Sequence, residues 1–396
     1  MTGVDPLPWI RLNLVPGVGP ILAARLLEAF DNNPAAIFAA NQTAMRRVKG
    51  IGAAIADELI NREHARRAEA ELDEATQHGI HIVTLADESY PPGLRAINDP
   101  PVVLYVRGEL KPDDALAVGI VGTRHPNYYG RDQSHRFAEL LARAGFTIVS
   151  GFAAGIDTAA HRGAIAAHGR TVAVLGSGLL DIYPAENAGM VPEVEAAGAL
   201  ITEYSLHTAP STGTFPRRNR IIAGMSLGTL VVQADRKSGA MITAQFAMEY
   251  GREVFAIPGP IDQNRHTGCH FLIRSGATLV ERLEDILEQL GPIQDHITTP
   301  DAARQARQRE LFGATADAPS TAPAPSGPPP NLSPDETAVW NALGSEPLSV
   351  DALAGQAGLP VHRVVSALTL LELKGAAGRV GGRHYTRRLW IMSDSW

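Results

Sequence analysis

Between residues 115 and 290, short apolar runs alternate with longer stretches of helical character, and this alternation restricts the fold more than any other feature. The apolar runs have the length of strands: LAVGIVG, FTIVSG, TVAVLG, ALITEY, GTLVVQAD, REVFAIPG and ATLVE. Strands that are apolar at nearly every position are buried on both faces, and helices between them give parallel pairing. We therefore predict an α/β domain over residues 76–290, with a doubly wound, Rossmann-like, mostly parallel sheet.

Residues 9–64 carry a different pattern, in which two helical stretches meet at a glycine turn. The pattern occurs twice, with turns at Pro16-Gly17-Val18-Gly19 and Lys49-Gly50-Ile51-Gly52 that begin 33 positions apart. It is typical of helix-hairpin-helix units, so we predict a helical, SAM-like domain over residues 1–75. Amides at the second helix of each unit can hold a phosphate. The same turns also serve as connectors in a small packing module, and both alternatives stay open.

The C-terminal part of the chain is predicted as a linker followed by a small separate domain. Residues 291–332 are rich in Pro, Ala and Ser and lack the apolar content of a core. Residues 333–390 combine a helix start at Ser333, a helical stretch at 361–373 and a glycine-turned hairpin, which together predict a winged helix. Such a domain binds either duplex DNA, through its recognition helix, or a protein, and the sequence is compatible with both.

Composition excludes several classes of protein. The 396-residue chain has a formal net charge of −7, which argues against coating DNA by bulk charge but permits a local basic groove. Its single cysteine, Cys269, forms no internal disulfide, so a reducing compartment is expected. The first residues lack the regions of a signal peptide, and no apolar run is long enough to span a membrane. We therefore expect a cytoplasmic protein that does not insert into membranes.

In an open α/β sheet, ligands bind beyond the carboxyl ends of the strands, and here those positions carry glycines, hydroxyl groups and cations. The residues are Gly122, Thr123 and Arg124 after the first strand, Ser150, Gly151 and Gly155 after the second, Ser177 after the third, Arg217, Arg218, Asn219 and Arg220 after the fourth, and Lys237 and Ser238 after the fifth. Helices begin close to most of these loops, so free backbone amides face the same edge. The set suits several phosphate groups rather than one.

The stretch TFPRRNRIIAGMS concentrates three arginines within four positions, directly before an apolar helical run. Guanidinium groups bind phosphate oxygens and stack on bases, and a cationic groove with aromatic side chains is typical of single-strand binding. Phe152, Tyr183 and Phe215 are candidate stacking residues, although each taken alone fits a core position better. The alternative for the arginines is ion pairing with Glu203 or with a second subunit.

Catalytic signatures are missing from the same loops. There is no GxGxxG after the first strand and no GxxxxGK[ST], the fingerprints of dinucleotide and P-loop sites. The serines do not lie in a GxSxG motif. His161 fits a packed histidine and Asp157 a helix-start cap, and no cluster of His, Asp or Glu has metal-ligand spacing. We therefore expect no catalytic residues, no metal and no cofactor.

Seven motifs of this region resemble those of the DNA-processing protein family DprA, also called Smf. They are GIVGTRHPNYYG, SGFAAGIDTAAH, VLGSGLLDIYPAEN, ITEY, FPRRNRIIAGMS, VVQADRKSGAMITAQFAMEYGREVFAIPG and GCHFLIRSGA. The resemblance implies an extended Rossmann domain that binds single-stranded DNA, usually as a homodimer. It also implies protection of incoming strands in natural transformation and loading of the RecA recombinase onto them, without a catalysed reaction.

Carried over by motif, the strand-binding pocket uses Arg124 with the amides near Gly122 and Thr123, the Gly151–Gly155 loop, Arg217, Asn219 and Arg220, and Lys237 with Ser238. Two departures from the family pattern concern charge. Ala185 stands where the family often has a lysine after the Tyr-Pro pair, and Gln233 stands where an acid is common.

The leading hypothesis is therefore a non-enzymatic single-strand DNA-binding protein that passes DNA to a recombinase. The first alternative is an enzyme that processes a nucleotide or nucleoside phosphate, because doubly wound domains commonly hold such ligands. The second is a transcription regulator, in which the winged helix reads DNA and the sheet domain senses a ligand.

Overall fold

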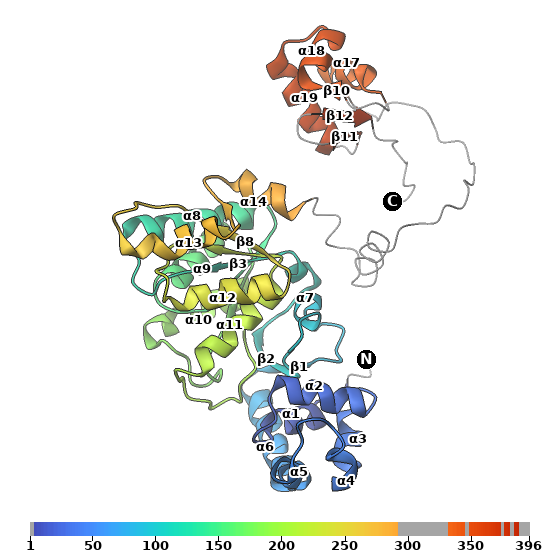
Figure 1. Ribbon diagram of the computed structural model, residues 1–396, viewed down its shortest axis with the longest axis vertical. Coiled ribbons are helices and arrows are strands. Elements are labelled where there is room, and N and C mark those ends of the chain that lie inside the picture. Colours follow the sequence, from blue (N-terminus) through green and yellow to red (C-terminus); the bar gives the residue numbers. More distant parts are fainter. Residues whose placement is uncertain (1–3, 292–331, 345–347, 374–375, 381–383, 388–396) are drawn as a thin grey trace, which may run out of the picture. The chain divides into compact units, whose positions relative to one another are not determined.

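The computed structural model describes residues 4–291, 332–344, 348–373, 376–380 and 384–387. These residues form two compact units, one within residues 1–312 and one within residues 313–396 (Figure 1). Nearly all of the linker predicted at 291–332 lies outside the described residues.

The larger unit is built on a sheet of nine strands in its described part, with the spatial order β1-β2-β6-β5-β4-β3-β7-β8-β9. The strands are β1 (His81–Thr84), β2 (Val103–Gly108), β3 (Ala117–Val121), β4 (Thr147–Ser150), β5 (Thr171–Val174), β6 (Gly198–Thr202), β7 (Gly228–Val231), β8 (Glu253–Ala256) and β9 (Thr278–Leu279). From β6 to β9 all neighbours are parallel, whereas β1 and β2 extend the sheet by antiparallel pairing. The predicted doubly wound, mostly parallel sheet is confirmed.

Helices cover both faces of this sheet (Figure 1). On one face, α8 (Tyr128–Arg143), α9 (Ile156–Ala166) and α14 (Leu283–Leu290) share an apolar core with side chains such as Ile120, Ile148 and Leu230. On the other face, α11 (Thr214–Met225), α12 (Gly239–Glu249) and α13 (Thr267–Arg274) pack on Val121, Val149 and Val231. Successive strand residues point to opposite faces, which is why the strands must be apolar at nearly every position.

The strand order reverses between β3 and β7, because β4, β5 and β6 lie on one side of β3 and β7, β8 and β9 lie on the other. This is the topological switch point of a doubly wound sheet. The loops after β3, β4, β5 and β7 all leave the same edge of the sheet, since these strands are parallel. The predicted strand-end residues are therefore brought to one edge.

The N-terminal residues form the helices α1 (Leu7–Leu14), α2 (Pro20–Ala29), α3 (Pro34–Ala39), α4 (Gln42–Met45), α5 (Ala53–Ile60) and α6 (Glu63–Gln77). Both predicted glycine turns are present, and Gly17 and Gly50 adopt positive φ angles of 81° and 99°, which glycine tolerates best. The helices share one core with the sheet unit, since Trp9 and Leu12 belong to the same buried cluster as Tyr105.

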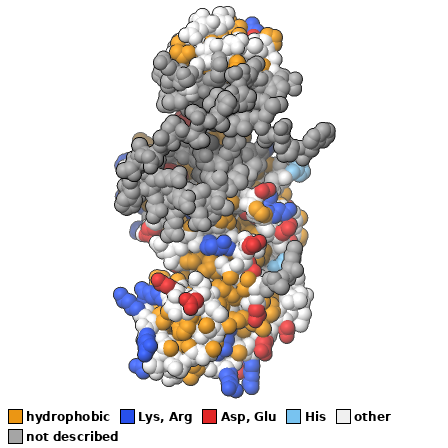
Figure 2. All heavy atoms as spheres, turned by 90° about the vertical axis from the view of Figure 1, so that its right-hand side faces the viewer, with side chains coloured by type: hydrophobic (Ala, Val, Ile, Leu, Met, Phe, Trp, Pro, Cys, Tyr) orange, Lys and Arg blue, Asp and Glu red, His pale blue; other side chains and the backbone are white. Residues whose placement is uncertain are grey.

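One face of this helical module shows how its basic side chains are distributed. On the face drawn in Figure 2, the lower part of the molecule, where Figure 1 places α1 to α6, carries its Lys and Arg side chains at the margins, with hydrophobic side chains between them. Arg11 is used internally, because it donates to the carbonyl oxygen of Leu59 at 3.0 Å and lies over the ring of Phe38. This face therefore gives the phosphate-binding alternative no continuous basic patch.

The smaller unit consists of α17 (Pro334–Ala342), β10 (Leu348–Ser349), α18 (Val350–Ala357), α19 (Val361–Leu373), β11 (Ala377–Val380) and β12 (His384–Arg387). Three helices and a small sheet of order β10-β12-β11 make the predicted winged helix. Ser333 and Glu336 form a capping box at the start of α17. Arg363 of α19, the predicted recognition helix, pairs with Asp335 at 2.6 Å instead of lying free.

Within the described part of the chain, none of the helices combines the length and the apolar character that crossing a bilayer requires. The same part holds no group of three or more His, Cys, Asp or Glu side chains arranged to bind a metal ion.

Candidate nucleic-acid interface

The predicted strand-end residues fall into three groups in the structure: exposed, half-buried and buried. Arg124, Arg217 and Lys237 are exposed, and their charges face solvent. The half-buried members are Gly122, Thr123, Gly155, Asn219 and Ser238, and the buried members are Ser150, Gly151, Ser177, Arg218 and Arg220. Only the first two groups have surface that a ligand can reach, so the accessible site is smaller than the sequence suggests.

Arg124 is placed against an aromatic side chain. Its guanidinium carbon lies 4.9 Å from the ring centroid of Phe215, the second residue of α11. Tyr183, which is 43 % exposed, lies beside the same ring with centroids 5.6 Å apart. Two of the three candidate stacking aromatics therefore gather beside an exposed cation. Phe152, the third, is completely buried and belongs to the core.

Lys237 and Ser238 lie in the loop that leads into α12. Ser238 caps that helix, because its side-chain oxygen accepts from the amide of Ala240 at 3.3 Å. The amide of Lys237 donates to the carboxylate of Asp235 at 2.7 Å, and Lys237 itself is exposed. Asn219 connects α11 to this loop by donating to the carbonyl oxygen of Gly239 at 3.2 Å.

Arg218 does not face a phosphate site, and the prediction that its guanidinium group reaches solvent is wrong. It is 3 % exposed and donates to the carbonyl oxygens of Gly151 and Val174, at the ends of β4 and β5. Burial lowers the pKa of Arg218 to about 10, opposed by the charge of Asp157. The side chain remains a cation at neutral pH and ties α11 to two strand ends.

Gly151 is a glycine because Arg218 passes directly beside it. A β-carbon on Gly151 would lie 2.6 Å from both Nη1 of Arg218 and Oδ2 of Asp157. The buried hydroxyl groups nearby are also used internally, since Ser150 donates to the carbonyl oxygen of Ile120 at 2.6 Å and Ser177 is only 1 % exposed. These residues shape the loops, and the expectation that their polar groups face a ligand is corrected.

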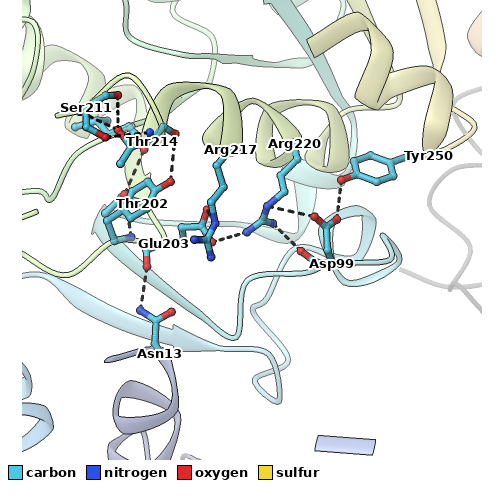
Figure 3. Close-up of polar contacts among 11 residues, drawn as sticks. Asn13, Asp99, Thr202, Glu203, Ser211, Thr214, Arg217, Arg220 and Tyr250 are labelled. Atoms are coloured by element: carbon cyan, nitrogen blue, oxygen red, sulfur yellow. Dashed lines mark hydrogen bonds and ion pairs between the residues drawn. The ribbon is translucent and has the colours of Figure 1, made fainter. Parts of the chain in front are cut away.

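Arg220 is likewise buried, at 2 % exposure, and is paired inside the protein (Figure 3). Its Nη2 atom contacts Oε2 of Glu203, its Nη1 atom donates to the carbonyl oxygen of Asp99 at 2.7 Å, and its Nε atom lies 3.5 Å from Oδ2 of Asp99. Tyr250 donates to the other oxygen of Asp99 at 2.7 Å. The alternative of ion pairing with Glu203 is therefore confirmed for Arg220, and the predicted solvent-facing orientation is wrong.

Arg217 links this buried network to the surface. Its Nε atom lies 3.5 Å from Oε1 of Glu203, while 45 % of its side chain is exposed (Figure 3). Burial raises the pKa of Glu203 and the charge of Arg220 opposes that shift. Arg217 therefore pairs with Glu203 on its inner side, while the exposed part of its guanidinium group can still be reached by a ligand.

The switch point itself is filled by side chains. The carbonyl oxygen of Gln233 accepts from the amide of Thr123 at 2.7 Å, and its side chain bonds to Asn127 at 3.1 Å and contacts His266 at 2.9 Å. A β-carbon on Gly122 would lie 2.6 Å from Ile156. The crevice in which doubly wound folds receive a nucleotide is therefore occupied by the protein's own groups.

A second set of cations lies beside Arg124 and was missed in the sequence. The structure contains a groove of about 780 Å³ between the N-terminal halves of α8 and α9, lined among others by Arg124, Arg131, Arg162, Arg265, His125 and His135. The sequence carries a signal for Arg131, because a helix that begins at the carboxyl end of a strand keeps its first turn at that edge. Arg131 and Arg162 lie inside α8 and α9 rather than in the loops that follow the strands.

Two titratable groups under the loops are buried and have opposite effects on pH-dependent stability. Burial raises the pKa of Asp157 to about 6, opposed by the charge of Arg218. Its carboxylate accepts from the amide of Ala153 at 3.3 Å and so fixes the preceding loop, rather than capping the helix as predicted. Burial lowers the pKa of His161 to about 3. His161 contacts Thr171 Oγ1 at 2.7 Å, which confirms the packed histidine.

We expect His161→Gln to flatten the pH dependence of stability on the acid side. Because the folded pKa of His161 lies below its ordinary value of 6.5, the unfolded chain binds an extra proton between pH 3 and 6.5, and folded stability falls as the pH drops. The contribution is about 1.4 kcal/mol per pH unit. Urea unfolding of the unmodified protein and of His161→Gln, each at pH 7 and pH 5, checks this expectation. Asp157 contributes equally to the two proteins, so the difference between them reports His161. A stability difference that does not change with pH would contradict the buried neutral state.

Three segments of the chain match known families. Residues 81–291 match the family described as DNA recombination-mediator protein A. Residues 322–383 match the DprA winged helix domain, and residues 10–64 match the SAM-like helix-hairpin-helix tandem. The three segments correspond to the sheet, the winged helix and the glycine-turned helices described above.

Full-length relatives support the same assignment. Protein Smf of Synechocystis sp. is 35 % identical over 392 residues, which cover 96 % of this chain and 98 % of that protein. Protein Smf of Escherichia coli is 39 % identical over 322 residues, 79 % of each protein. The X-ray structure of DNA processing protein A (DprA) from Streptococcus pneumoniae superposes with a TM-score of 0.59 at 31 % identity and covers 74 % of this chain and 100 % of that one. The chain therefore belongs to the DNA recombination-mediator protein A family, whose members carry the names DprA and Smf.

Proposed function

We propose that this protein binds single-stranded DNA at the strand-end edge of its sheet and passes the strand to the RecA recombinase. The observation that carries the proposal is the group formed by Arg124, Arg217 and Lys237, three exposed cations at one edge, beside the aromatic rings of Phe215 and Tyr183. Cations for the backbone and rings for the bases are what a single strand requires. Membership of a recombination-mediator family supports the transfer to a recombinase.

The protein acts without catalysing a reaction, in the cytoplasm, as a homodimer joined through the Rossmann-like domain. Protection of exposed or incoming strands in natural transformation and recombination follows from such binding. The two titratable groups buried under the loops, Asp157 and His161, both hold structure, which supports a binding role. The winged helix supplies a further contact, to duplex DNA or to a protein, and pairing of Arg363 with Asp335 reduces the free charge on its recognition helix.

The test is the affinity for an oligo-dT of about 30 nucleotides, long enough to exceed one binding site, measured by fluorescence anisotropy over a salt series. Arg124→Ala combined with Lys237→Ala is expected to weaken binding by about tenfold to a hundredfold and to lower the slope of log K against log salt by about 1.4, since each lost phosphate contact accounts for about 0.7. Arg66→Ala with Arg67→Ala, on the exposed side of α6, removes the same charge elsewhere and serves as control. Equal affinities of the two variants would refute the proposal.

The nucleotide-processing enzyme is the competing function. Gln233 and Ile156 fill the switch point, which weighs against it. A thermal-shift comparison of mononucleotides with oligo-dT separates the two functions. We expect stabilisation by the oligonucleotide and none by mononucleotides, because one phosphate engages only a fraction of the cations. The reverse result would favour the enzyme.

A further inference from the structure

The groove between α8 and α9 is a built feature rather than a gap in the surface. Its floor is fixed by Asn187, whose side-chain nitrogen donates to the carbonyl oxygen of Phe152 and to Thr158 Oγ1, both at 2.9 Å. Asn187 is 6 % exposed, and both it and Thr158 line the groove. The walls are held by the close approach of α8 to α9 at Gly163. The groove therefore keeps its shape without a ligand.

The charge lining the groove is strongly positive. Four arginines contribute to it, namely Arg124, Arg131, Arg162 and Arg265, against the single carboxylate of Asp132. Within the described residues none of these four arginines has a carboxylate within ion-pair distance. Arg265 donates to the carbonyl oxygen of His125, which also lines the groove. Unpaired guanidinium groups that line one concave surface select an extended polyanion.

The position of Arg124 connects this groove to the site proposed above. Arg217 and Lys237 lie on the side of the sheet covered by α11 and α12, whereas Arg131 and Arg162 belong to α8 and α9 on the other side. Arg124 follows β3 in the middle of the sheet and lines the groove as well. Arg124 therefore joins the two sets of cations, because it lies over Phe215 of α11 and also lines the groove.

We propose that the groove between α8 and α9 is a second segment of the single-strand path, in which Arg131 and Arg162 bind backbone phosphates. This inference rests on the proposed function, because it extends the same bound strand across the sheet edge. The groove takes a sugar-phosphate backbone without reading its sequence, since its cations are guanidinium groups, which suit phosphate oxygens.

The experiment compares two double variants of the full chain on the same oligo-dT of about 30 nucleotides. Arg131→Ala with Arg162→Ala removes two groove cations. Arg136→Ala with Arg143→Ala removes two exposed cations from α8 outside the groove and is the matched control. We expect the groove variant to lose about tenfold in affinity and about 1.4 in the salt slope, while the control stays within about twofold of the unmodified protein.

Three outcomes decide whether the groove belongs to the single-strand path. A groove variant that binds as tightly as the control overturns the inference, and the proposed function survives if Arg124→Ala with Lys237→Ala still weakens binding. A groove variant that loses affinity for a duplex of the same length but not for oligo-dT also overturns it, since the groove would then serve duplex DNA. Loss confined to the single strand, with unchanged circular dichroism and melting temperature, establishes the groove as part of the strand path.

Discussion

Replacement of Arg220 by methionine is expected to lower the free energy of unfolding by about 3–5 kcal/mol, the usual cost of removing one partner of a buried ion pair. The reason lies in what is left behind. Glu203 is 4 % exposed and would keep a buried carboxylate without its partner, and Asp99 would lose its contact with the guanidinium group. Methionine has a similar length and an apolar stem, so it keeps much of the packing of arginine. The drop in the free energy of unfolding therefore reports mainly the loss of the positive charge. Urea unfolding followed by circular dichroism checks the value.

Arg217→Ala is the control for that experiment, because Arg217 contacts the same Glu203 from the surface. Arg217 is half-exposed, and Glu203 keeps Arg220 as its buried partner when Arg217 is removed, so this variant should lose much less stability than Arg220→Met. Arg220→Met combined with Glu203→Gln should recover part of the lost stability, because the unpaired carboxylate is then gone. The buried network would be disproved as a stabilising element if Arg220→Met and Arg217→Ala unfolded at the same urea concentration.

Gly163→Ala is expected to cost about 3 kcal/mol, at the upper end of what overpacking produces. A β-carbon at this position would lie 2.2 Å from the carbonyl oxygen of His135 and 2.9 Å from the β-carbon of Ala138, so α8 and α9 must separate. The clash involves backbone, which no side-chain rotation relieves. The same separation changes the groove between these helices, so single-strand affinity should fall together with stability.

Gly239→Ala is the matched control, since Gly239 is the first residue of α12 and a β-carbon there meets nothing within 4 Å. Alanine favours helix over glycine by roughly 0.5–1 kcal/mol, so this variant should be neutral or slightly more stable. Chemical unfolding of both variants makes the comparison. Equal stability of Gly163→Ala and Gly239→Ala would mean that α8 and α9 are not in close contact in solution.

In the arginine stretch, residues 217–220, the sequence predicts the position of the helix but not the directions of its side chains. Its place after β6 and the helix that contains it follow from local pattern, and both are confirmed. The directions of Arg218 and Arg220 do not, because their partners are distant: Arg218 donates to Gly151, 67 positions away, and Arg220 to Asp99, 121 positions away. No local property of these arginines distinguishes them from Arg217, which reaches solvent.

Sequence alone determined the sheet, its mostly parallel pairing, both glycine turns and the winged helix. The signals for these features, apolar periodicity, glycine turns and helix caps, are each contained within a few consecutive residues. The sequence also brought Arg124 and Lys237 to one edge, since parallel strands end together. Tertiary structure alone decided which cations are free to bind and that Arg131, Arg162 and Arg265 share a groove. Which cations are accessible depends on burial and on contacts between segments far apart in the chain. A charge that packing buries requires a partner inside the protein, whereas a charge at the surface is solvated by water.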